Sequence, residues 1–306
     1  MQPCRSYLVW GFLNSLYGLR SAGRGVAIGV SSTASDESAT VPSNGELASP
    51  FMGEAGGAVI RHRGKRSMSG AGPKKSHWLD YFVAYVPAGA VFSVRVDQLR
   101  ALAAKHAPGP IFEICLVALV AYFEAFCKDQ FAAVINLCPK TLDKFTKKKK
   151  RKGLAVELSE LLPFVGEVDS RLGFLLSDRR DFDFGRPDGI NNLYHDLLGI
   201  TPFSKDQAQK YDRLLDERNL LVHHGGVFTV KHVKRYFPEH DVASVANADS
   251  VEVTPESLQD SIGFLEGIAK KVVLRSHHAL EKFVLENEIE LDSERKEALG
   301  YLALFD

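Results

Sequence analysis

The sequence is poor in several features, and each shortage excludes a class of protein. Only 4 cysteines occur among 306 residues, which excludes a small fold held together by disulfides. Neither charge sign is in excess, because Lys plus Arg and Asp plus Glu both number 38 and the formal net charge is zero. A neutral protein has no overall field that draws it onto nucleic acid or an anionic membrane. Any site for a polyanion must therefore be local.

Three of the cysteines, Cys115, Cys127 and Cys138, fall in one stretch that we expect to be helical. At about 1.5 Å of rise per residue, neighbours in this set lie roughly 16–18 Å apart, too far for a disulfide or a shared metal. We expect them to be small buried groups in a reducing compartment. The sequence also lacks a phosphate-binding glycine loop, a nucleophile elbow and a His/Cys cluster at ligand spacing. It therefore predicts no metal and no cofactor.

Composition divides the chain into two parts. Residues 1–76 are rich in Gly, Ser and Ala, and up to residue 77 nine Lys/Arg face only four acids. Such a stretch buries too little apolar surface to offset the entropy of ordering, so we interpret 1–76 as a disordered leader and 77–306 as the folded domain. A charge-free apolar run from Ser6 to Leu19 leaves open an organellar transit peptide, a secretory signal or a misassigned start. Otherwise we expect a cytoplasmic protein.

The hydrophobic pattern after residue 77 is helical. Residues 111–137 are apolar nearly all round, which predicts a helix at the centre of the core, and the acids at 113 and 124 argue against a membrane span. We expect other helices over 94–106, 154–176, 204–224, from 255 onward and 293–304, a polar turn over 177–189, and possible short strands at 227–230 and 251–253. The fold class is an all-α bundle with four to five main helices and no membrane partner.

One charged residue breaks this pattern. At about 100° per residue, Arg218 lies in the middle of the apolar face of the helix that ends at His224. A guanidinium cannot shed its proton, so it must be paired or face a wet cleft. Two interpretations remain open. Arg218 bonds an acid on another helix, with Glu124 as a candidate, or Arg218 and His223 face a cleft and handle a phosphate.

The residues from Arg218 to His223 read Arg-Asn-Leu-Leu-Val-His. This motif resembles the HEPN superfamily, whose hallmark is Arg-x(4–6)-His, commonly Arg-Asn-x-x-x-His. The helix order over residues 94–290 is most similar to the RiboL-PSP-HEPN and MAE-type branches. The resemblance implies a HEPN-like bundle that forms a homodimer through the motif helix, so that two motifs line one cleft. It also implies metal-independent endoribonuclease activity, with RNA as the substrate.

The resemblance implies a role for each motif residue. Arg218 would clamp the phosphate, His223 would transfer protons, and Asn219 would orient either group, while the RNA 2′-OH attacks and leaves a 2′,3′-cyclic phosphate. Glu124 and His224 are weaker supporting candidates. On an ideal helix Arg218 and His223 lie about 140° apart, so one bare face cannot bring them together. This separation favours a site shared by two protomers.

Two further alternatives stay open. The chain is a non-catalytic HEPN module that binds nucleic acid or a partner protein, such as an antitoxin, in a defence or toxin–antitoxin system. Alternatively, it is a scaffold in which Arg218 is an internal salt bridge. A basic run can also hold an RNA backbone or form a plain solvated loop. Its residues are Lys147, Lys148, Lys149, Lys150, Arg151 and Lys152.

Overall fold

The computed structural model describes residues 77–148, 154–179, 181–246 and 248–305. Within these ranges the chain is all-α, which confirms the predicted class, and no strand occurs there. The predicted strands are wrong: one isolated antiparallel bridge joins Val227 and Ser250. The chain leaves the extended course early because the Thr229 hydroxyl accepts a hydrogen bond from His232 N and caps a helix. The proposed leader, residues 1–76, lies outside the described residues.

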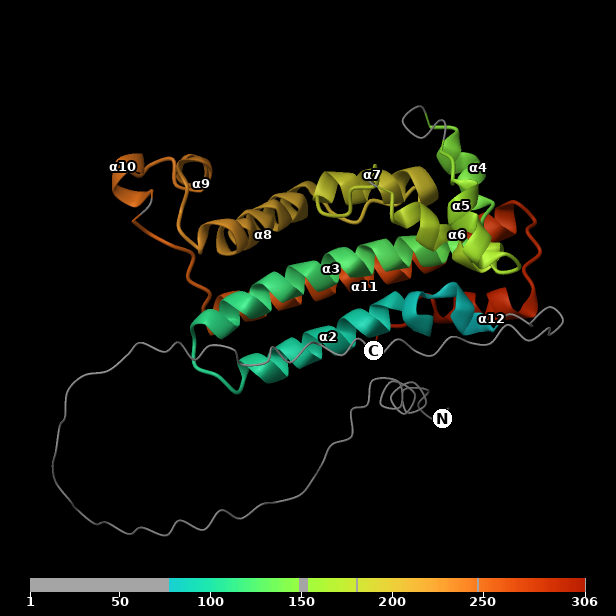
Figure 1. Ribbon diagram of the computed structural model, residues 1–306, viewed down its shortest axis with the longest axis horizontal. Helices are drawn as coiled ribbons and strands as arrows, with labels where there is room; N and C mark the ends of the chain where they lie inside the picture. The colour runs from blue at the N-terminus through green and yellow to red at the C-terminus, as the bar shows by residue number, and fades with distance from the viewer. Residues whose placement is uncertain (1–76, 149–153, 180, 247, 306) are drawn as a thin grey trace, which may run out of the picture. The chain divides into compact units, whose positions relative to one another are not determined.

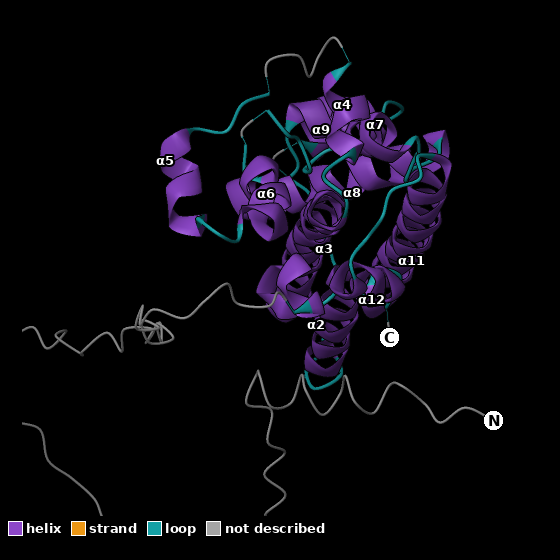
Figure 2. Ribbon diagram, turned by 90° about the vertical axis from the view of Figure 1, so that its right-hand side faces the viewer, coloured by secondary structure: helices purple, strands orange, loops and turns teal. Residues whose placement is uncertain are grey.

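A long central helix, α3 (Pro110–Leu137), organises the fold. Figures 1 and 2 show α2 (Ala88–Ala103), α11 (Pro255–Glu286), α6 (Val168–Ser177) and α8 (Lys205–His224) packed around it. The core follows from the sequence of α3, because apolar residues on nearly every side of a helix require neighbours on nearly every side. Phe123 of α3 makes edge-on contacts with Phe92 of α2 and Tyr211 of α8.

Shorter helices complete the fold. They are α4 (Thr141–Thr146), α5 (Leu158–Leu161), α7 (Pro187–Leu198), α9 (Val230–Tyr236), α10 (Val242–Val245) and α12 (Ser293–Tyr301), with 3-10 turns at Trp78–Tyr81, Val83–Tyr85 and Leu162–Phe164. The single helix predicted over 154–176 is wrong. Pro163 lies in a 3-10 turn after α5, and Gly166 has a φ of +88°, so the chain turns before α6 begins.

The three cysteines occupy the positions expected of small apolar groups. Cys115 and Cys127 have no exposed surface, and Cys138 is 2% exposed. Burial raises the pKa of each thiol. All three are free, so the prediction that they do not pair is confirmed.

By length and hydropathy, α3 is also compatible with a membrane span. The acidic residues of α3 do not take it outside the hydropathy and charge range of a membrane span. In this fold, Leu119, Phe123 and Phe131 of α3 have no exposed surface and belong to the core of the bundle. The same residues that satisfy the hydropathy test therefore hold the surrounding helices together.

A carboxyl group on α3 gives the first stability prediction. Burial raises the pKa of Asp129 from 3.8 to about 6, and Asp178 adds to this while Lys128 opposes it. A raised folded-state pKa means that this group favours folding below about pH 4 and that the benefit is lost as pH rises through 6. We expect Asp129→Asn to increase the free energy of unfolding by roughly 1–3 kcal/mol at pH 7.5.

Urea unfolding at two pH values measures this effect. The difference between Asp129→Asn and the original protein should shrink toward zero near pH 4, where the native carboxyl is protonated. A variant that is less stable than the original protein at pH 7.5 would contradict the assigned environment of Asp129.

Candidate functional site

The helix that carries the motif has well-defined ends. At its start, the Ser204 hydroxyl accepts a hydrogen bond from Gln207 N at 3.3 Å, and Gln207 Oε1 accepts one from Ser204 N at 3.0 Å. At its end, Gly225 and Gly226 adopt φ values of +59° and +84°, which stop the helix. The boundaries predicted from the sequence are confirmed, and the motif occupies the last two turns of α8.

Arg218 forms an ion pair across the bundle. Its Nη2 donates to Glu124 Oε1 on α3 at 2.7 Å, and the two side chains are 25% and 27% exposed. Among the residues that the structure describes, Glu124 is the only hydrogen-bond partner of Arg218. Of the two interpretations of Arg218, the structure therefore shows the first, in which Arg218 bonds an acid on another helix. A guanidinium has five N–H donors, so a partly exposed one bonded through one nitrogen can still bind a second anion.

The surroundings of Glu124 are unusual for a carboxylate. Burial raises its pKa, the charge and hydrogen bond of Arg218 lower it, and the nearby charge of Asp183 raises it further. Asp183 is itself held in place, because its Oδ1 accepts a hydrogen bond from Gly185 N at 2.9 Å. Fully buried Tyr211 adjoins this group, and its hydroxyl has no hydrogen-bond partner within the described part of the chain. The charge of Arg218 thus opposes the rise that burial causes in the pKa of Glu124.

The other motif residues face outward. Asn219, His223 and His224 are all exposed. The structure therefore brings Arg218 and Glu124 together and leaves the two histidines of the motif helix on the surface. Within one chain, the described residues show no contact between Arg218 and His223, as the 140° separation predicted.

Exposed valines lie in sequence on either side of the histidines. Val222 is 50% exposed, Val227 is 36% exposed and Val230 is 47% exposed. Large apolar side chains are costly to leave in water, so an exposed group of this kind is typical of a surface that another molecule covers. The end of α8 therefore offers apolar area beside its imidazoles.

The basic run is only partly described. Lys147 and Lys148 follow α4 and are exposed. Lys149, Lys150, Arg151 and Lys152 lie outside the described residues. The two cations that the structure places have no ion pair with another described residue, which leaves them available to an anion.

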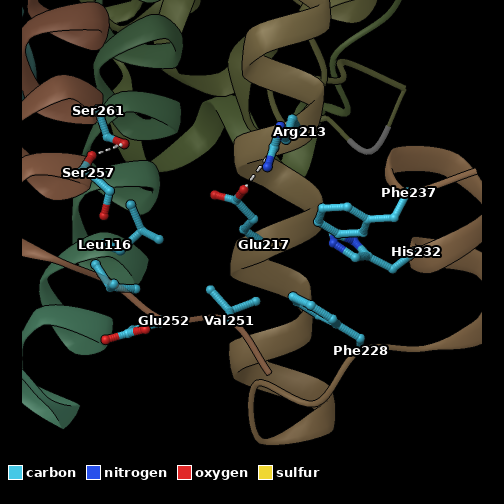
Figure 3. Close-up of a pocket in the computed structure, with 11 residues that line it drawn as sticks. Leu116, Arg213, Glu217, Phe228, His232, Phe237, Val251, Glu252, Ser257 and Ser261 are labelled. Atoms are coloured by element: carbon cyan, nitrogen blue, oxygen red, sulfur yellow. Dashed lines mark hydrogen bonds and ion pairs between the residues drawn. The ribbon is translucent and has the colours of Figure 1, made fainter. Parts of the chain in front are cut away.

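A pocket beside the motif is a feature that sequence reasoning missed (Figure 3). It has a volume of about 230 Å³ and is lined by α8, the segment after α8, α9 and the residue after it, the start of α11 with the segment before it, and one residue of α3. Its lining residues are Leu116, Arg213, Glu217, Phe228, His232, Phe237, Val251, Glu252, Val253, Ser257 and Ser261. These residues come from distant segments and share no spacing, so no sequence motif could have revealed them.

Helix α9 forms one side of this pocket because it is anchored to α8. The Tyr236 hydroxyl and Arg235 Nη1 both donate to Asp216 Oδ2 at 2.7 Å. Burial lowers the pKa of His232, while the charge of Asp216 opposes that shift. The anchor fixes the position of His232, whose ring lies between the rings of Phe228 and Tyr236.

Comparison with known proteins yields no relative. No family model, no curated protein and no solved structure matches the chain. Within the described ranges, no group of three or more His, Cys, Asp or Glu residues could hold a metal ion.

Proposed function

We propose that the chain is a HEPN-type, metal-independent endoribonuclease that cleaves RNA by attack of the 2′-OH and leaves a 2′,3′-cyclic phosphate. The observation that carries this proposal is the state of Arg218. It has one hydrogen-bond partner among the described residues, keeps a quarter of its side chain exposed, and lies on the same helix as exposed His223. A positioned cation with spare donors is what a phosphate site requires.

The residue types match the chemistry. A neutral imidazole accepts the proton of the ribose 2′-OH, and an imidazolium donates a proton to the departing 5′-oxygen. A guanidinium stabilises the negative charge that builds on the phosphate oxygens in the transition state. Asn219 is exposed one residue after Arg218, where its amide can hold a ribose or phosphate oxygen.

The site we propose is completed by a second copy of the chain. His223 does not contact Arg218 of its own chain within the described residues, so each site would combine Arg218 of one chain with His223 of the other, with water carrying the second proton. Pairing two chains through the end of α8 would cover Val222, Val227 and Val230 and place two motifs in one cleft. The dimer thus supports both the chemistry and the burial of the exposed valines.

An RNA cleavage assay in EDTA tests the proposal. Purified protein is incubated with structured and unstructured RNA beside Arg218→Ala and His223→Ala, and the product ends are identified. We expect 2′,3′-cyclic phosphate ends and a loss of at least about 100-fold in rate for either variant. Absence of cleavage by the original protein, or cleavage that survives both substitutions, contradicts the proposal.

The ion pair between Arg218 and Glu124 favours a second candidate. If the guanidinium serves only to neutralise Glu124, the chain is a non-catalytic helical module that binds nucleic acid or a partner protein. The same assay separates the two functions, because this module would bind RNA without cleaving it.

The basic run gives a prediction about RNA affinity. Lys147 and Lys148 are exposed, so we expect the double alanine variant to bind RNA with a weaker salt dependence. The slope of log affinity against log salt should fall by about 0.7 for each lost phosphate contact. Fluorescence anisotropy between about 50 and 200 mM salt measures it, and an unchanged slope would show that these lysines do not contact the backbone.

A further inference from the structure

The pocket beside α8 combines aromatic and aliphatic walls with polar side chains. Phe228 and Phe237 contribute aromatic surface, and Val251 and Leu116 contribute aliphatic surface. The ring of His232 stacks on Phe228, with centroids 4.9 Å apart and planes inclined by 24°. A slot bounded by flat apolar groups accommodates a planar ring better than a branched or flexible ligand.

A buried imidazole points into this slot. His232 is only 6% exposed, and its ring nitrogens have no hydrogen-bond partner among the residues that the structure describes. Figure 3 shows the ring extending from α9 toward Glu217 of α8. A neutral imidazole has one donor and one acceptor nitrogen. The unused nitrogens of His232 are therefore available to a ligand.

The opposite side of the slot carries a carboxylate with one oxygen still available. Arg213 Nε donates to Glu217 Oε1 at 3.0 Å, and no described residue bonds the second oxygen of Glu217. The charge of Arg213 offsets that of Glu217, and Glu252 lies at the exposed rim. A pocket with little net internal charge favours a neutral ligand over a free phosphate or an amine.

Size limits the ligand further. A volume of about 230 Å³ is below the 300–1,000 Å³ that is usual for drug-sized ligands, so a single small ring system fits. We propose that this pocket binds a nucleobase and that guanine is the base it fits best. The N1–H and N2–H₂ edge of guanine offers donors to the available oxygen of Glu217, and its O6 or N7 accepts from the one N–H donor of His232.

This inference rests on the proposed function insofar as it makes the base part of an RNA substrate. Glu217 directly precedes Arg218, and Phe228 follows His223 by five residues. A base held in this pocket would therefore belong to a nucleotide near the phosphate that the motif handles. The pocket would select the nucleotide, whereas Arg218 and His223 would cleave the chain.

Titration with nucleosides tests the pocket without requiring catalysis. Guanosine, adenosine, cytidine and uridine are added to the full chain, and binding is followed by NMR shifts of backbone amides. Nucleosides carry no phosphate, so Arg218 does not contribute to the result. We expect guanosine to bind at least tenfold more tightly than the other three, and Glu217→Gln to reduce its affinity about tenfold.

A matched control isolates the pocket from general effects of charge. Glu286 of α11 forms an ion pair with Lys282, four residues earlier, at 3.6 Å, and Glu217 forms the same kind of pair with Arg213. Glu286 does not line the pocket. Glu286→Gln should leave guanosine affinity unchanged. Equal binding of all four nucleosides, no binding, or no effect of Glu217→Gln would overturn the inference.

The outcomes separate this inference from the proposed function. If the protein binds guanosine but cleaves no RNA, the nucleobase-binding proposal is supported and the endoribonuclease proposal is contradicted. If the protein cleaves RNA but binds guanosine no more tightly than the other nucleosides, the nucleobase-binding proposal is contradicted and the endoribonuclease proposal stands.

Discussion

Alanine in place of Gly173 is expected to destabilise the fold by at least about 3 kcal/mol. Gly173 lies where α6 crosses α3, and a Cβ there would be 2.0 Å from the carbonyl oxygen of Ala132. Its amide donates to Asn136 Oδ1 at 2.6 Å, and Asn136 Nδ2 donates to Tyr81 O at 3.2 Å. Backbone cannot rotate away as a side chain can, so the helices must separate and this buried network must break.

Gly263 provides the matched control. It is an exposed helical glycine on α11 with nothing within 4 Å of the added Cβ. Gly263→Ala should raise the free energy of unfolding by about 0.5–1 kcal/mol, because alanine has the higher helix propensity. Urea unfolding followed by circular dichroism measures both variants. A loss below 1 kcal/mol for Gly173→Ala would mean that α3 and α6 do not approach as closely as described.

The second large effect is on catalysis. Arg218→Lys keeps a positive charge beside Glu124 but removes the planar fork that would bind two phosphate oxygens in the proposed function. We expect the rate of RNA cleavage to fall by about 100-fold or more, while the free energy of unfolding changes by less than about 1 kcal/mol. Cleavage within threefold of the original rate would show that the guanidinium does not act on the phosphate.

A double substitution separates the chemical role of Arg218 from its structural role. Arg218→Ala leaves the partly buried Glu124 without its counter-charge and should cost roughly 1–3 kcal/mol of stability. Adding Glu124→Gln removes that unpaired charge, so stability should return while cleavage does not. If cleavage returns together with stability, the role of Arg218 is structural only.

The sequence predicted those parts of the fold whose signals are local. The limits of α8 followed from Ser204, Gln207 and Gly225, which act on their own neighbours. In α11, Leu258, Ile262 and Leu265 recur at spacings of four and three residues, and all three are buried. The helix from Pro187 was missed because a run of acidic and basic residues precedes it and resembles a turn. Its hydrophobic contacts, such as Tyr194 with Phe131, come from another part of the chain.

The candidate site was predictable only in part. The position of Arg218 on an apolar face required a partner or a cleft, and Glu124, a candidate partner in the sequence, is the acid that it contacts. The pocket was not predictable, because Glu217 is an ordinary helix-surface residue until α9 places His232 opposite it. The depth and shape of a pocket depend on how separate helices pack. A residue pattern along the sequence does not predict that packing.

The most direct test of the account uses two inactive variants together. Arg218→Lys and His223→Ala are co-expressed so that mixed dimers form, and their RNA cleavage is compared with that of each variant alone. If the guanidinium and the imidazole act across two protomers, random pairing yields about half mixed dimers with one complete site each, and activity returns to about a quarter of the original. A mixture no more active than its separate components would contradict a cleavage site shared between two chains.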